Sequence, residues 1–216
     1  MPDLSFQVNS VEMLSFAAVP TLKFKLQVVD GATTELIHSV VLRCQIQIAA
    51  TRRHYGAHEQ EGLQDLFGDP DRWSQTLRSM LWTHASVVVP PFSGTTTIDL
   101  PVPCTYDFNV AATKYFHALD EGEVPLLFLF SGTIFYAADD GAFQVAQISW
   151  DKEAPFRLPI AVWKQMMQHY YPNSAWLNVR HDVFDRLYRY KMRRGLPTWE
   201  QAIESLLPTF DEQVPT

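Results

Sequence analysis

The chain has 216 residues, of which 47% are hydrophobic and 19% charged, a composition typical of an ordered globular protein rather than a disordered one. Its formal net charge of −7 disfavours bulk attraction to nucleic acid or to an anionic membrane surface. The N-terminus lacks a basic segment followed by an apolar one, and the two cysteines suit a reducing compartment. We therefore expect a cytoplasmic protein that does not span a membrane.

The N-terminal part of the chain predicts antiparallel strands. Residues 4–8 alternate between apolar and polar side chains, and the same alternation is clearer over residues 22–28 and 40–48. Asp30-Gly31 provides turn chemistry between the last two segments. We predict that residues 22–28 and 40–48 pair as an N-terminal hairpin, with one face buried and the other in water.

Residues 51–120 interrupt this pattern, and we interpret them as a long insertion within the domain. A loop with a short helical piece is predicted over residues 51–72, which contain several glycines. The spacing of Trp73, Leu77 and Met80 predicts a helix over residues 71–82. Strands are predicted over residues 84–92 and 95–102, whereas residues 107–119 fit either a helix or an irregular bridge.

The longest apolar run, Val124 to Phe130, predicts a central strand that is buried on both faces. It continues to Tyr136, and the hairpin turn at residues 139–141 leads into a further strand over residues 142–150.

Beyond Pro159 the apolar period changes from 2 to about 3.6 residues, which predicts helices. The first ends near Tyr171, the second spans residues 178–194, and the third follows Thr198 as its N-cap. Three apolar residues of the third helix are expected to be buried: Ile203, Leu206 and Leu207. Strands followed by helices predict an α+β fold, with a mainly antiparallel sheet packed against C-terminal helices. We expect a single domain over residues 1–208 and a loose tail over residues 209–216.

One candidate metal site lies within the predicted insertion. His54 and His58 are four residues apart and Glu59 follows directly, a spacing that on a helix would place both imidazoles on one face, as zinc requires. The HExxH arrangement is absent, and Gly56 weakens a helix between the histidines. We favour a solvated loop and keep a metal site at His54, His58 and Glu59, with His84 as a further ligand, as an alternative.

No residue in the sequence is assigned a catalytic role, and no cofactor is predicted. Cys44 and Cys104 have no second cysteine nearby and no signature of a nucleophile, so we interpret both as core thiols. Ser131-Gly132-Thr133 follows a strand, but the lysine and glycines of a phosphate-binding loop are missing.

The predicted helix over residues 178–194 is strongly basic, with six basic residues against two acidic ones. Four arginines, Arg186, Arg189, Arg193 and Arg194, are candidates for binding an acidic protein partner. The alternative is a solvated helix face whose basic last turn complements the helix dipole. No nucleic-acid reader motif accompanies these residues, so we do not expect a nucleic acid as the partner.

Two stretches carry a resemblance to a known family. They are residues 73–136, beginning WSQTLRSMLW, and residues 176–207, beginning WLNVRHDVFDRLYRYK. Both resemble an uncharacterised, mostly actinobacterial family whose genes are found among those for [NiFe] hydrogenases and their maturation factors. The resemblance covers the chain from Leu22 to Leu207 and implies no catalytic residues.

A second resemblance concerns the order of elements. Antiparallel strands followed by a helix, a break at Tyr170-Tyr171-Pro172-Asn173 and a long helix are similar to SecB-type export chaperones. Those chaperones lack the segment 51–120, and a likeness of fold does not establish function.

Together these observations lead to the expectation of a non-catalytic binding protein, an accessory or maturation factor for a hydrogenase or similar metalloenzyme. A metal-dependent enzyme or metal carrier that uses His54 and His58 is the first alternative. A permanent structural subunit of a larger complex is the second, and the sequence does not fix the oligomeric state.

Overall fold

The computed structural model describes residues 1–32, 36–105, 110–138, 141–174, 177 and 179–207. The chain divides into two compact units, Met1–Ser174 and Ala175–Thr216. The single domain expected over residues 1–208 stays a prediction, and the predicted loose tail at 209–216 lies outside the described residues.

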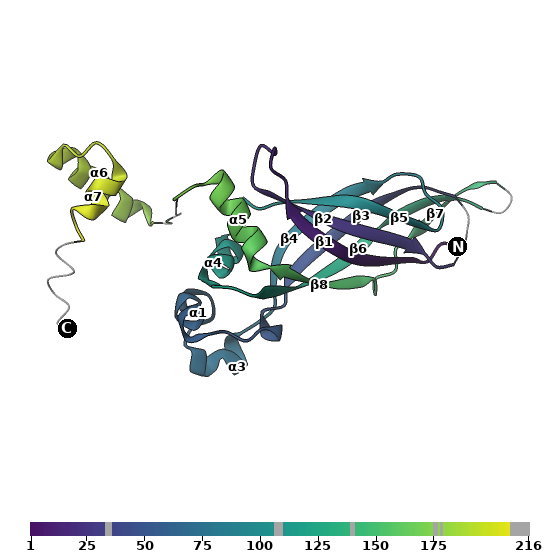
Figure 1. Cartoon of the computed structure of the whole chain (residues 1–216), viewed down its shortest axis with the longest axis horizontal. Coiled ribbons are helices and arrows are strands. Elements are labelled where there is room, and N and C mark those ends of the chain that lie inside the picture. The colour runs from purple at the N-terminus through teal and green to yellow at the C-terminus, as the bar shows by residue number, and fades with distance from the viewer. Residues whose placement is uncertain (33–35, 106–109, 139–140, 175–176, 178, 208–216) are drawn as a thin grey trace. The chain divides into compact units, whose positions relative to one another are not determined.

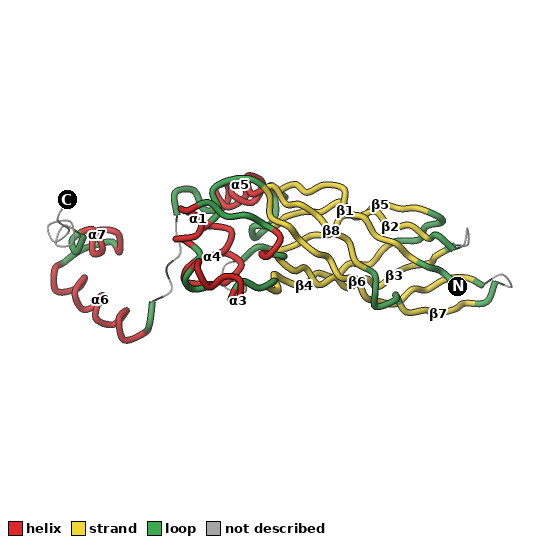
Figure 2. The backbone as a smooth tube through the Cα atoms, turned by 90° about the horizontal axis from the view of Figure 1, so that it is seen from below, coloured by secondary structure: helices red, strands yellow, loops and turns green. Residues whose placement is uncertain are grey.

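The first unit is built from two antiparallel sheets, which lie face to face in Figures 1 and 2. The three-stranded sheet has the order β1 (Leu4–Met13), β2 (Thr21–Asp30), β5 (Thr95–Pro103). The second sheet has the order β4 (Met80–Val89), β3 (Ile37–Ile48), β6 (Glu123–Ala137), and both β7 (Phe143–Gln147) and β8 (Glu153–Pro159) pair with β6. The predicted α+β fold with antiparallel sheets is confirmed.

The predicted pairing of residues 22–28 with residues 40–48 is wrong. β2 pairs with β1 and β5, whereas β3 pairs with β4 and β6 in the other sheet, so the N-terminal hairpin is β1–β2. The alternation itself is correct, because the inward-facing apolar residues of both strands are buried, whereas Val41 on the outer face of β3 is 40% exposed. Phe24 of β2 reaches Phe128 of β6 with ring centroids 5.1 Å apart. Alternation identifies the buried face of a strand but not its neighbour.

β6 is the central strand, as predicted, but only one of its faces is fully buried. Leu126, Phe128 and Phe130 point into the core, whereas Leu127 and Leu129 on the opposite face are half-buried. The first part of β6 pairs with β8 and the last part with β7. Between the two parts, a Cβ atom at Gly132 would lie 2.1 Å from the carbonyl oxygen of Val41, so glycine is required where β6 passes β3.

Helices cover one end of the sandwich in Figures 1 and 2. They are α1 (Ala57–Gly62), α2 (Gln64–Phe67), α3 (Trp73–Thr76), α4 (Val110–Ala118) and α5 (Ile160–Tyr170), with short 3₁₀ turns at Ala50–Arg52 and Pro70–Arg72. Phe116 of α4 stacks on Trp163 of α5 with centroids 5.1 Å apart, and its edge contacts Trp82 of β4. These aromatic contacts join the helices to the core of the sandwich.

The predicted helix over residues 71–82 is wrong for its second half. The chain is helical only over α3 and the preceding 3₁₀ turn, and Met80 already begins β4. The segment interpreted as an insertion, residues 51–120, contributes β4 to one sheet and β5 to the other.

The second unit contains α6 (His181–Arg194) and α7 (Trp199–Glu204). Gly195 ends α6 in a left-handed conformation with φ of 64°, and Leu196 N donates to the Lys191 carbonyl. The Thr198 hydroxyl accepts a hydrogen bond from Gln201 N, which confirms the predicted cap. The predicted burial of Ile203, Leu206 and Leu207 is wrong: all three are exposed, and the buried residue of α7 is Ala202.

Candidate functional site

The residues of the predicted metal site do not share one helix. His54 lies in the loop before α1, whereas His58 is on α1, where Nδ1 lies 3.0 Å from an Asp120 carboxylate oxygen. Glu59 is buried and bound to Arg53, and His84 is on β4. Within the described ranges, no three His, Cys, Asp or Glu residues gather where they could hold a metal ion. The metal site at His54, His58 and Glu59 stays a prediction.

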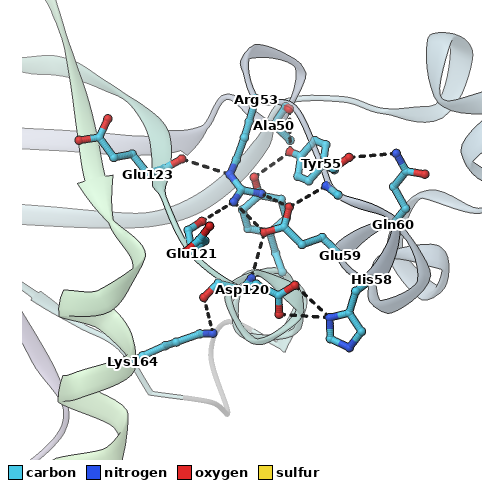
Figure 3. A network of polar contacts seen from close by, with 12 residues as sticks. Ala50, Arg53, Tyr55, His58, Glu59, Gln60, Asp120, Glu121, Glu123 and Lys164 are labelled. Atoms are coloured by element: carbon cyan, nitrogen blue, oxygen red, sulfur yellow. Dashed lines mark hydrogen bonds and ion pairs between the residues drawn. The ribbon is translucent and has the colours of Figure 1, made fainter.

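Glu59 is instead the centre of a buried polar network, shown in Figure 3. Its two carboxylate oxygens accept from Arg53 Nη1 at 2.9 Å and Nη2 at 2.7 Å, a bidentate ion pair. They also accept from Gly56 N at 3.1 Å and Asp120 N at 2.9 Å. Arg53 in turn donates to the carbonyls of Glu121 and Glu123. One ion pair therefore joins the start of α1 to the loop between α4 and β6.

The network keeps both of its central groups charged. Burial alone would raise the pKa of Glu59, but the hydrogen bonds from Arg53, Asp120 N and Gly56 N outweigh burial and hold that pKa below its usual range. Burial alone would lower the pKa of Arg53, whereas the hydrogen bond to Glu59 raises it. Glu59 is thus a poor general base, because its lone pairs are occupied and its protonated form is disfavoured.

Two tyrosines extend the network into the core. The Tyr55 hydroxyl donates to the Ala50 carbonyl at 2.7 Å and lies 2.8 Å from the Tyr115 hydroxyl. Since the single proton of Tyr55 is used on Ala50, Tyr115 is the donor between the two phenols. Burial raises the pKa of both phenols. Among the described residues, no buried side-chain nitrogen or oxygen lacks a partner.

This network is not predicted by the sequence pattern. Arg53 and Glu59 are six residues apart in a segment without regular periodicity, and Asp120 is 61 residues beyond Glu59. One local signal was present: glutamate three residues after Gly56 at the start of a helix is the glutamate half of a capping box.

The four arginines predicted to bind a partner are all exposed on α6. Arg186, Arg189 and Arg193 follow one another at spacings of three and four residues and therefore share a face of the helix. Arg194 follows Arg186 by eight residues and lies on the same half of the helix, with its guanidinium 5.6 Å from the centroid of the Tyr190 ring. Arg186, Arg189 and Arg193 thus form a basic row, and Arg194 borders it; that these four arginines bind a partner stays a prediction.

A different side of α6 carries apolar side chains that remain accessible. Phe184 is 44% exposed, Tyr188 48% and Met192 60%, and these residues are spaced four apart. The Trp199 ring at the start of α7 lies 5.2 Å from the Phe184 ring and 6.2 Å from the Tyr188 ring. We call Phe184, Tyr188, Met192 and Trp199 the aromatic face of α6. It lies next to basic residues, since Lys191 Nζ is 5.6 Å from the Trp199 ring.

Both cysteines are buried free thiols, as the sequence predicted. Cys44 lies in β3 and Cys104 directly after β5, so the two belong to different sides of the sandwich. Burial raises the pKa of each thiol to about 12. The reactive thiolate is therefore scarce at neutral pH.

The solved structures that this chain matches share little sequence with it. A protein described as late embryogenesis abundant is 15% identical over 74% of this chain and 73% of its own, with a TM-score of 0.32. A CARDB domain from Pyrococcus furiosus, solved with di-metal ions, is 10% identical over 73% of this chain and 92% of its own, with a TM-score of 0.26. The ApaA protein from Bordetella pertussis is 11% identical over 73% of this chain and 93% of its own, with a TM-score of 0.23. Likenesses this distant do not bear on function.

Two further comparisons concern the membrane and the family. In the part of the chain that the structure describes, no helix is both long enough and apolar enough to cross a bilayer. A comparison with curated proteins finds no significant match. A family model does match, and it covers residues 1–215, so the chain belongs to DUF6084, a family of unknown function.

Proposed function

We propose that this chain is a non-catalytic binding protein that holds a protein partner through α6. The observation that carries the proposal is the pairing of two surfaces on one helix, a row of three arginines and the aromatic face. Isolated exposed apolar residues are ordinary, but aromatic residues gathered beside arginines are the composition of protein-binding surfaces.

The two surfaces have different tasks in this proposal. The aromatic face supplies affinity, because burying Phe184, Tyr188 and Trp199 removes apolar area from water at about 25 cal/mol per Å². Arg186, Arg189 and Arg193 attract an acidic surface on the partner and orient it, which raises the rate of encounter. The partner surface that fits is therefore an apolar groove bordered by carboxylates.

The class of partner that we propose is a subunit or maturation factor of a [NiFe] hydrogenase or a similar metalloenzyme. Its support is the resemblance of residues 73–136 and 176–207 to a family whose genes occur among those of hydrogenases. The contact is transient for an accessory factor and permanent for a structural subunit.

The test is affinity capture from the native host, grown under conditions that induce hydrogenase, with recovered proteins quantified by mass spectrometry. The wild-type chain should recover a hydrogenase subunit or maturation factor in stoichiometric amount. The triple variant Arg186→Glu, Arg189→Glu, Arg193→Glu should recover at least tenfold less of it. Recovery of the chain alone would count against a stable partner of this class.

A matched control distinguishes the effect of where the charges lie from the effect of how many are changed. Arg43, Arg72 and Arg78 are also exposed, and they lie in the first unit. The triple variant Arg43→Glu, Arg72→Glu, Arg78→Glu changes the net charge equally and should recover the partner as the wild type does. Equal loss in both triple variants would show a general charge effect and remove α6 from the proposal. Circular dichroism should show unchanged secondary structure in each.

A further inference from the structure

A small pocket opens beside two paired strands of the first unit, next to the polar network of Arg53 and Glu59. Its volume is about 330 Å³. The pocket is lined by Arg52, Pro125, Leu126, Pro155, Phe156 and Arg157. Pro125 pairs with Arg157 and Leu126 pairs with Phe156 across β6 and β8, while Arg52 comes from the 3₁₀ turn before α1. Three separate segments therefore meet at this pocket.

The backbone that carries Arg52 is held firmly against β6. Ala49 N, before the turn, donates to the Pro125 carbonyl at 2.9 Å, and the Ala50 carbonyl accepts from the Tyr55 hydroxyl. After the turn, Arg53 donates to the Glu123 carbonyl at 3.2 Å, as Figure 3 shows. The polar network thus fixes the turn on both sides of Arg52, so the pocket is preorganised.

The apolar lining of the pocket comes from residues on both faces of the strands. Pro125 and Pro155 lie on the outer face with Arg157, whereas Leu126 and Phe156 point toward the core, where the Phe156 ring contacts Phe24. Pro125 and Leu126 are buried, Phe156 is half-buried and Pro155 is exposed. Two prolines restrict the backbone of both strands here, which limits collapse of the pocket. A ligand body that packs against the two prolines would be aromatic or branched aliphatic.

The two arginines of the pocket retain donors for a ligand. Among the described residues, the Arg52 side chain makes no hydrogen bond or ion pair. The Arg157 guanidinium has one long ion pair, 4.0 Å to a Glu123 carboxylate oxygen, and both of these side chains are largely exposed. Exposed pairs of this length contribute little, so Arg157 is available to an anion. Two guanidinium groups beside an apolar wall are a local basic site in a chain whose net charge is −7.

We propose that this pocket binds a carboxylate carried on an apolar body. Arg52 and Arg157 donate to the carboxylate, for which the planar guanidinium has matching bidentate geometry. Pro125 and Pro155 contact the body. The volume is at the lower end of the range for small-molecule pockets, which fits one ring or one branched side chain. The source is either a free aryl or alkyl acid or the C-terminus of a peptide that ends in an apolar residue.

The probes for the experiment are phenylacetate and the tripeptide Gly-Gly-Phe, each compared with its uncharged amide. The full chain, labelled with ¹⁵N, is titrated with each probe and the amide shifts of Leu126, Phe156 and Arg157 are followed. We expect saturable shifts with a dissociation constant at or below about 1 mM for at least one acid, and at least tenfold weaker binding of its amide. Tighter binding of the tripeptide assigns the site to a peptide C-terminus, and tighter binding of phenylacetate assigns it to a free acid.

The double variant Arg52→Gln, Arg157→Gln should weaken binding of the acid at least tenfold. Its matched control is Arg72→Gln, Arg78→Gln, which removes two exposed arginines outside the pocket and should bind as the wild type does. No saturable shift with either acid, equal binding of acid and amide, or unchanged binding in the Arg52/Arg157 variant would each overturn the proposal. The result of this titration does not depend on whether α6 binds a protein partner, because the probes are added to the isolated chain.

Discussion

The two units of the chain differ in the exposure of their apolar side chains. In the sandwich, the inward-facing residues of β2 and β3 are buried and every described buried polar side chain has a partner. In the second unit, α6 has no buried residue, although it is strongly amphipathic. A region that leaves an apolar side accessible contributes less to folding and is better suited to binding. The first unit contains the buried core that stabilises the fold, and the second unit is where we expect a partner to bind.

The largest effect should come from Gly132→Ala in the sandwich. The new Cβ would lie 2.1 Å from the Val41 carbonyl oxygen, so β3 and β6 must separate. We expect a loss of at least about 4 kcal/mol in the free energy of unfolding, or failure to fold. Gly31→Ala is the control, because its Cβ meets no atom closer than 3.9 Å. Urea unfolding of both variants is the measurement, and a mild effect at Gly132 would contradict the close approach of the two strands.

Glu59→Gln should have the next largest effect, because it leaves the Arg53 charge buried without its counter-ion. The two side chains are only 10% and 7% exposed, and we expect a loss of about 3 kcal/mol. The pKa of Glu59 is held below its ordinary value of 4.5, so its contribution is present above that pH and is lost as pH falls through the lowered pKa. The difference between wild type and variant in urea unfolding should therefore shrink at acid pH.

The control for this effect is Glu61→Gln, which alters an exposed carboxylate two residues away. It should change stability by less than about 0.5 kcal/mol at neutral pH. If Glu59→Gln were equally mild, the ion pair would not stabilise the loop before α1.

A pair of methionines compares the two units directly. Met166 on α5 is fully buried, whereas Met192 on α6 is 60% exposed. Met166→Ala should cost about 2.5 kcal/mol because it opens a cavity, and Met192→Ala should stay within about 0.5 kcal/mol. Thermal unfolding measures both. A large effect at Met192 would mean that the aromatic face of α6 is covered within the isolated chain and would weaken the binding proposal.

The smallest effect concerns the helix cap of the second unit. Thr198→Ala removes the hydrogen bond from Gln201 N and should destabilise α7 by about 1 kcal/mol. Amide hydrogen exchange should quicken in α7 while the amides of β3 and β6 keep their rates. Equal acceleration in the sheets would show that both units unfold together, as the predicted single domain over residues 1–208 requires.

Features that depend on neighbouring residues could be predicted from the sequence. The Thr198 cap, the stop at Gly195 and the buried faces of β2 and β3 all follow from local patterns. Features that depend on pairing could not. Trp73, Leu77 and Met80 fit a helical period, yet pairing with β3 draws Met80 into a strand.

The candidate sites also divide into those set by neighbouring residues and those set by contacts between distant segments. The basic residues of α6 are visible in the sequence because they lie along one helix. The Arg52–Arg157 pocket and the contact between Glu59 and Asp120 N join segments far apart in the chain, and only the fold brings them together. Periodicity carries no information about such contacts.

The two buried thiols allow local opening of the sandwich to be measured without a further label. A thiol reagent such as 5,5′-dithiobis(2-nitrobenzoate) needs an accessible thiolate, so its reaction rate at each site measures how often that part of the sandwich opens. Cys44 reports on β3, and Cys104 reports on the end of β5. Equal reaction rates at the two thiols would indicate that the two sheets separate in one cooperative event. A faster rate at Cys104 would indicate that the three-stranded sheet opens before the other sheet does.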